Sequence, residues 1–114
     1  MDTVARVAEQ FGKFIAKEDY FAAYTLLTEE AQAVHSPEEF REAVAEMTTY
    51  APGLIRKVQV MEEFILEDWS DKKERDLAVV YVALQGDGFN EAVTVTLTEE
   101  RRKIRIRELQ SGRP

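Results

Sequence analysis

Hydrophobic side chains in the first half of the chain recur at intervals of three and four residues, which places them on one face of a helix. The pattern predicts three helices, at residues 4–16, 20–31 and 37–50. Asp19 is a suitable N-cap for the second helix. The segment Ser36-Pro37-Glu38-Glu39 combines a capping box with a first-turn proline, and it marks the start of the third.

From residue 54 onward the hydrophobic period changes to two, which is typical of strands. Strands are predicted at residues 55–67, 77–85, 91–98 and 103–109, with a bulge where Phe64-Ile65-Leu66 interrupt the alternation of the first. Residues 69–74 and 86–90 read as turns, and such short connections make neighbouring strands antiparallel. The sequence therefore predicts a single α+β domain over residues 1–114, with three N-terminal helices packed on a curved four-stranded antiparallel sheet.

The composition of the 114 residues excludes several classes of site. There are no cysteines and one histidine, which removes disulfide scaffolds, thiol nucleophiles and cysteine zinc sites. We expect no metal and no cofactor. The longest apolar run is shorter than the roughly 18 residues of a membrane helix, and the N-terminus lacks the basic and apolar regions of a signal peptide. A cytoplasmic protein that does not bind membranes is the expectation.

The charge of −7 is unevenly distributed along the chain. Residues 1–100 carry 9 basic and 21 acidic side chains, whereas residues 101–114 carry 6 basic and 1 acidic. An acidic surface repels phosphate backbones, so nucleic acid is not expected as a partner.

The alternation of the last predicted strand places Lys103, Arg105 and Arg107 on one face as a basic row, with Thr94, Thr96 and Thr98 on the neighbouring strand. This row either meets an acidic partner or an anionic ligand, or protects the sheet from edge pairing and balances nearby glutamates. The sequence leaves both interpretations open.

Aromatic and acidic residues supply the candidates for a pocket. Tyr20, Tyr24, Tyr50 and Tyr81 either line a pocket with their hydroxyls or are core residues whose hydroxyls reach the surface. Tyr81 is the strongest pocket candidate because it lies in the middle of the most apolar strand. Asp68-Trp69 is either a buried acid beside an indole, with a raised pKa, or a strand end at which the aspartate is hydrated and the tryptophan covers the core.

His35 is the only histidine, and histidine is the residue type best suited to general base catalysis, which makes it a candidate general base. Its position just before a helix N-cap indicates a surface loop instead. Adjacent acids such as Glu62-Glu63 point in different directions, so they predict no metal site unless the fold brings them together. No catalytic residue is assigned from the sequence.

The order of elements resembles the nuclear-transport-factor-2-like superfamily, also called the cystatin-like α+β roll. The resemblance covers nearly the whole chain and rests on three stretches and a long bent strand followed by a meander. The stretches are Phe11-Gly12-Lys13-Phe14-Ile15, Lys17-Glu18-Asp19-Tyr20-Phe21-Ala22-Ala23-Tyr24 and Ser36-Pro37-Glu38-Glu39-Phe40. Phe89-Asn90-Glu91-Ala92-Val93 and Gly112-Arg113-Pro114 are similar to uncharacterised bacterial members.

This resemblance implies a sheet that wraps around a long helix and leaves a conical pocket, and a homodimer formed through the sheet face. It implies a non-enzymatic domain that binds a small apolar ligand or a partner protein. One alternative is a cofactor-free lyase or isomerase of the ketosteroid isomerase-like or polyketide cyclase-like type, with Tyr81, Asp68 or Tyr24 as its polar group. Another is an immunity-type protein that neutralises a basic toxin.

Overall fold

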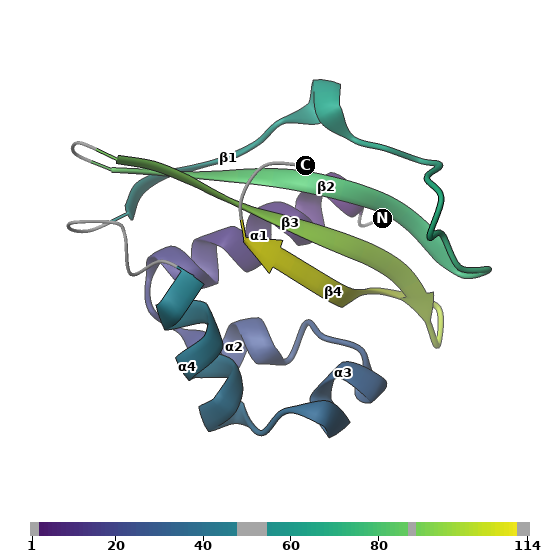
Figure 1. The fold of residues 1–114 in the computed structure, drawn as a ribbon, viewed down its shortest axis with the longest axis horizontal. Coiled ribbons are helices and arrows are strands. Elements are labelled where there is room, and N and C mark those ends of the chain that lie inside the picture. Colours follow the sequence, from purple (N-terminus) through teal and green to yellow (C-terminus); the bar gives the residue numbers. More distant parts are fainter. Residues whose placement is uncertain (1–2, 48–54, 87–88, 112–114) are drawn as a thin grey trace.

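A four-stranded sheet forms one layer of the structure, and the α-helices lie against one face of it (Figure 1). This computed structural model describes residues 3–47, 55–86 and 89–111. The helices are α1 (Val4–Ala16), α2 (Tyr20–Tyr24), α3 (Glu29–Val34) and α4 (Pro37–Met47). The strands are β1 (Ile55–Val60), β2 (Asp76–Gly86), β3 (Phe89–Glu100) and β4 (Lys103–Ser111). The predicted α+β class and antiparallel sheet are confirmed.

The prediction of three helices is wrong, because the described part of the chain contains four α-helices. The segment that was expected to continue α2 to residue 31 instead pairs with β4. The Ile106 amide donates to the Leu26 carbonyl at 2.8 Å, and the Thr28 amide donates to the Ile106 carbonyl at 2.9 Å. Thr28 then caps α3, because its side chain accepts from the Ala31 amide at 3.1 Å. The edge of β4 therefore divides the predicted helix in two.

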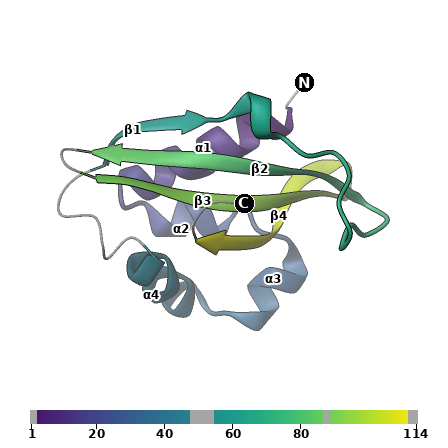
Figure 2. The same cartoon turned by 45° about the horizontal axis from the view of Figure 1, so that its top comes forward.

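The strands follow one another in the order β1-β2-β3-β4, and each pair is antiparallel (Figure 2). Val80 pairs with Val95 and Val82 pairs with Val93. Because side chains alternate along strands, these four point to the same face, and all are buried beneath the helices. The predicted turn at residues 86–90 includes residues 87–88, which lie outside the described residues, as do the predicted end of the third helix and Tyr50.

The first strand is shorter than predicted. β1 ends at Val60, and the chain continues into a 3₁₀ helix, η1 (Glu62–Phe64). It returns to the edge of β2 at Leu66, which forms an antiparallel bridge with Val79. The interruption expected at residues 64–66 is therefore present, but it is larger than a bulge and begins earlier.

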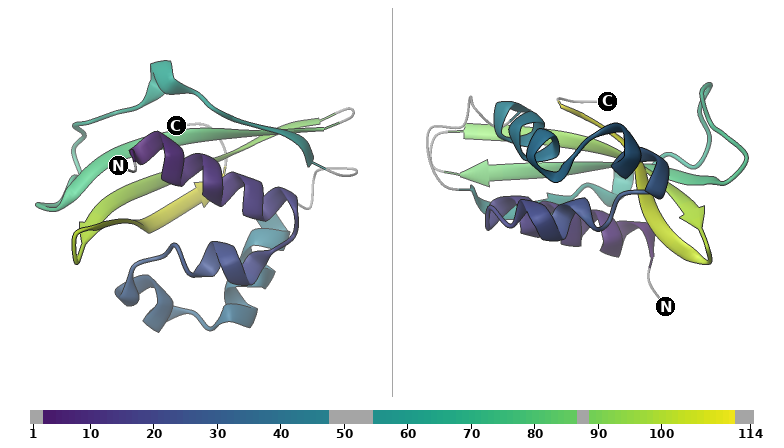
Figure 3. Two further views of the ribbon diagram at one scale, coloured as in Figure 1. Left: turned by 180° about the vertical axis from the view of Figure 1, so that it is seen from behind. Right: turned by 90° about the horizontal axis from the view of Figure 1, so that it is seen from below.

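Helix α1 supplies the apolar stripe that the sequence predicts, with Val7, Ala8, Phe11 and Ile15 all buried. Phe11 meets the ring of Phe40 edge-on at 6.3 Å between centroids, and Phe40 meets Tyr24 at 5.7 Å. This aromatic contact joins α1, α2 and α4 into one layer beneath the sheet (Figure 3).

The chain leaves α1 through a left-handed residue, Glu18, whose φ is 59°. The Asp19 amide donates to the Phe14 carbonyl at 2.8 Å, and the Glu18 amide donates to the Ile15 carbonyl at 3.0 Å. These two hydrogen bonds form a Schellman motif, in which glycine is the usual left-handed residue because it has no Cβ to clash with the backbone.

Replacing Glu18 by glycine should therefore stabilise the protein by about 1 kcal/mol, the cost of holding an L-residue in this conformation. Urea unfolding followed by circular dichroism would measure it. Glu18→Ala is the matched control, because it removes the carboxylate but keeps the Cβ. If alanine stabilised the protein as much as glycine, the backbone conformation would not be the cause.

Candidate functional site

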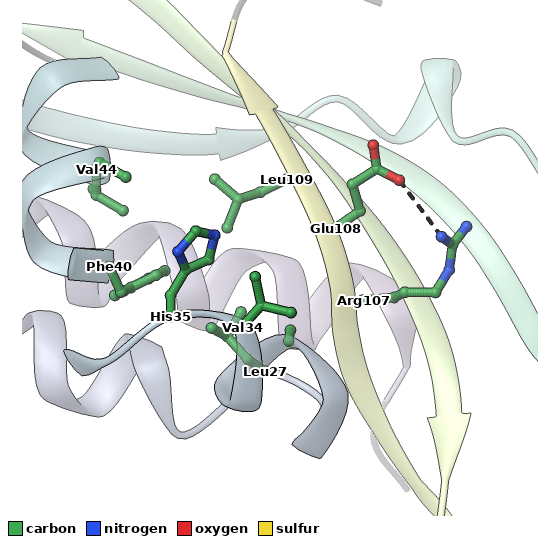
Figure 4. A pocket seen from close by; sticks show the side chains of 10 residues that line it. Leu27, Val34, His35, Phe40, Val44, Arg107, Glu108 and Leu109 are labelled. Atoms are coloured by element: carbon green, nitrogen blue, oxygen red, sulfur yellow. Dashed lines mark hydrogen bonds and ion pairs between the residues drawn. The ribbon is translucent and has the colours of Figure 1, made fainter.

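An open cavity of about 330 Å³ lies between α3, α4 and the inner face of β4 (Figure 4). Most of its walls are aliphatic or aromatic, and three polar residues stand at its border. The lining residues are Leu27, Ala31, Val34, His35, Phe40, Ala43, Val44, Arg107, Glu108 and Leu109. Its predominantly apolar lining with a few polar groups at the border makes it the candidate functional site.

The start of α4 is fixed by the predicted capping box. The Glu39 amide donates to Ser36 Oγ at 3.1 Å, and the Ser36 amide donates to Glu39 Oε1 at 2.8 Å. The pKa of the Glu39 carboxyl is lowered. The main cause is the hydrogen bond from the Ser36 amide, and the second is the hydrogen bond with the Ser36 hydroxyl. This start sets the rotation of α4, so Phe40 and Val44 turn toward the sheet and form one wall of the cavity.

Tyr24 holds the opposite wall in place. Its Oη lies 2.7 Å from the carbonyl oxygens of both Gln32 and His35, and its single proton can be donated to one of them at a time. Gln32 Nε2 in turn donates to the Tyr24 carbonyl at 3.0 Å. The hydroxyl of Tyr24 therefore fastens α3 and the α3–α4 connection to α2, and it does not line the cavity.

His35 lies in the connection between α3 and α4, and its ring stands between Phe40 and Leu109 at the cavity (Figure 4). The side chain is exposed, as its loop position predicts. Within the described residues, neither ring nitrogen has a hydrogen-bond partner in the protein. A ligand in the cavity would meet this imidazole as a free hydrogen-bonding group.

A register shift in β4 forms the other end of the cavity. Leu97 pairs with Ile106 and Thr96 pairs with Glu108, so Arg107 is the extra residue between them. Beyond this shift Leu109 points into the cavity. Arg107 instead crosses the sheet: its Nε donates to Asp76 Oδ1 at 2.9 Å and its Nη2 donates to Asp76 Oδ2 at 2.7 Å.

The side chain of Asp76 is 1% exposed, and that of Arg107 is 21% exposed. Asp76 also accepts a hydrogen bond from the Lys73 amide at 2.9 Å. Burial acts to raise the pKa of Asp76, but the hydrogen bonds from Arg107 and Lys73 outweigh burial and hold the pKa below its ordinary value. The cost of burying the Asp76 carboxylate is thus offset by a bidentate partner, Arg107.

The predicted basic row does not form one continuous surface. Arg107 is bound to Asp76, and Arg105 Nη1 donates to the Thr25 carbonyl at 2.6 Å, so Lys103 alone is fully exposed. Of the three threonines, Thr98 pairs with Arg105, whereas the shift places Thr96 and Thr94 opposite Glu108 and Gln110. Two members of the row therefore serve contacts within the chain.

The five predicted pocket residues are not brought together. Tyr81 lies on the sheet face away from the helices, with its ring 6.5 Å from that of Phe64. Asp68 is exposed, and Trp69 is half-buried with Lys72 Nζ 5.7 Å from its ring centroid. Tyr20 is half-buried at the start of α2, where burial first and then Glu18 raise the pKa of its hydroxyl. Tyr24 alone lies near the cavity.

Three residues that define the site were not predicted from the sequence. Val34 and Leu109 line the cavity, and Asp76 anchors Arg107. The register shift at Arg107 turns Leu109 toward the cavity, and this shift was not predicted. Asp76 precedes its predicted strand by one residue, and no pattern in the sequence connects it with an arginine 31 positions later.

No family model, no curated protein and no solved structure matches the chain. In the described ranges, no helix is long and apolar enough to cross a membrane. Nor does that part of the chain bring three or more histidine, cysteine, aspartate or glutamate side chains together as a metal site. The fold and the site define an α+β protein with an open apolar cavity between its helices and its sheet.

Proposed function

We propose that the protein is a non-enzymatic binding domain, an α+β roll of the nuclear-transport-factor-2-like kind, that takes up a small apolar molecule between α3, α4 and β4. The apolar lining of the 330 Å³ cavity carries the proposal. Removing apolar surface from water drives association, and this volume lies at the lower end of the range of about 300–1,000 Å³ for ligand pockets. A ligand of up to about three rings fits it.

The free imidazole of His35 supports a ligand that combines an apolar body with one hydrogen-bonding group. Apolar walls give affinity, and a single polar contact gives orientation. The alternative prediction, a lyase or isomerase, needs Tyr81, Asp68 or Tyr24 as the polar group in the pocket. Tyr81 and Asp68 lie away from the cavity, and the Tyr24 hydroxyl is bound to backbone carbonyls. The predicted homodimer through the sheet face stays a prediction.

The neutral fluorophore N-phenylnaphthylamine is a suitable probe, because its emission rises when it enters an apolar site. Titration should show saturable binding to the wild-type protein. Ala43→Phe adds a ring to the cavity wall from an exposed helix position and should weaken binding by about tenfold or more.

Ala45→Phe is the matched control, because it places the same ring on α4 at an exposed residue that does not line the cavity. It should bind the probe as the wild type does. Absence of binding, or equal affinity of the Ala43→Phe and wild-type proteins, would rule out the cavity as the ligand site.

A further inference from the structure

The chain forms a ridge on the sheet face opposite the helices, where it leaves β1 and returns to β2. We call residues 62–68 the acidic ridge. Figures 1 and 3 show it rising from the sheet on the side away from α1 and α4. It consists of η1 and the segment that follows, and it is separate from the helix–sheet cavity.

Backbone hydrogen bonds hold the ridge at both ends. The Met61 amide donates to the Tyr81 carbonyl at 3.0 Å, before η1. After η1, the amides and carbonyls of Leu66 and Val79 exchange hydrogen bonds of 3.0 and 2.8 Å. Between these anchors, the ring of Phe64 meets Tyr81 edge-on. The ridge is therefore a preorganised surface, which reduces the entropy lost when a partner binds.

The ridge exposes two large apolar side chains close together, with Phe64 55% and Leu66 44% exposed. Phe64 also borders a shallow cavity of about 410 Å³ that extends over Tyr81 and Ala83. An aromatic residue that projects from a rigid support beside a hollow is the kind of group that dominates interface energies.

The charges of the ridge decide what kind of partner it fits. The segment Glu62–Asp68 has four carboxylates and no basic residue. In the described part of the chain none of the four forms a salt bridge, and Lys72 Nζ donates to the backbone carbonyl of Glu67 rather than to its carboxylate. A basic surface would pair with these free charges.

A second copy of the chain fits the ridge poorly. A symmetric dimer uses the same patch on both subunits, so it would bring the two sets of carboxylates face to face. We therefore propose that the acidic ridge docks a basic partner protein, whose apolar side chains pack against Phe64 and Leu66 while its lysines or arginines pair with Glu62, Glu63, Glu67 and Asp68. This inference does not depend on the proposed ligand cavity.

Selection from a random-peptide phage library on the immobilised chain would test the proposal, because the library itself supplies the probe. Selected peptides should be rich in lysine or arginine together with leucine or an aromatic residue. Synthetic copies should bind the Phe64→Ser/Leu66→Ser variant at least about tenfold more weakly. They should also bind Glu62→Gln/Glu63→Gln more weakly and lose affinity as salt is raised.

Two matched controls distinguish binding at the ridge from nonspecific binding to any exposed aromatic side chain or any exposed carboxylates. Phe21→Ser removes a phenylalanine of α2 that is 70% exposed, and Glu38→Gln/Glu42→Gln removes two exposed carboxylates from α4. Both should bind the peptides as the wild type does, and circular dichroism should show all variants folded.

Three results would overturn the proposal. The first is a selection that yields no basic peptide whose binding depends on Phe64. The second is an equal loss of binding in the control variants. The third is a dimer in light scattering that Phe64→Ser/Leu66→Ser dissociates, because a second copy of the chain would then occupy the ridge.

Discussion

The Asp76→Asn variant is expected to unfold with a free energy about 3 kcal/mol lower than that of the wild type. Removal of one member of a buried ion pair costs about 3–5 kcal/mol, because the other charge is left without compensation. The lower end applies because the Arg107 side chain keeps 21% of its surface exposed. Urea unfolding at neutral pH measures the difference.

Asp71→Asn is the matched control, because it makes the same chemical change at an exposed residue of the loop before β2. It should change stability by less than about 0.5 kcal/mol. In a double-mutant cycle, Asp76→Ala and Arg107→Ala should be strongly non-additive, since each removes the same contact. Additive losses would show that the two side chains do not depend on each other.

The same carboxyl should contribute to acid unfolding. A group whose pKa is lowered on folding stabilises the native state when it is ionised. This contribution is complete above the ordinary value of 3.8 and is lost as the pH falls through the lower value of the folded state. The wild type should therefore lose stability below about pH 4, and Asp76→Asn should show a shallower loss over that interval.

The elements that the sequence predicts well are those in which one local period decides the fold. The apolar stripe of α1 needs only a buried face, and so do Val93, Val95 and Leu97 at alternate positions of β3; both sets are buried as expected. The capping box at Ser36 is also local, because Ser36 and Glu39 bind each other across three residues. Such features depend only on residues that are close in the chain, so they can be predicted from a single sequence.

The features that the sequence does not predict depend on distant partners. The predicted second helix is divided because Ile106 donates a hydrogen bond to the Leu26 carbonyl and accepts one from the Thr28 amide. No property of the Leu26–Thr28 segment alone indicates this pairing. The partner of Arg107 was not predicted for the same reason, because Asp76 is distant in the chain. Only the outward position of Arg107 was predicted. The contacts of β4 therefore settle both the division of the helix and one wall of the cavity.

Position 12 illustrates how close packing can outweigh local propensity. Glycine in a helix interior costs about 1 kcal/mol relative to alanine, yet the sequence places Gly12 in the middle of α1. A Cβ there would lie 2.6 Å from Cγ1 of Val58 and 2.9 Å from Cγ1 of Val82, on two adjacent strands. Both distances are far shorter than a van der Waals contact, and valine side chains have little rotamer freedom to move away.

Gly12→Ala should therefore lower the free energy of unfolding by about 2 kcal/mol. Two contacts this short place the overpacking cost at the upper end of the range of about 1–3 kcal/mol, and the gain in helix propensity offsets only about 1 kcal/mol of it. Gln10→Ala, on the exposed face of α1, is the control and should leave thermal stability nearly unchanged. Adding Val58→Ala removes the closer of the two contacts, so Gly12→Ala should cost less in that background than in the wild type. If Gly12→Ala raised the melting temperature instead, α1 would not lie as close to β1 and β2 as the structure places it.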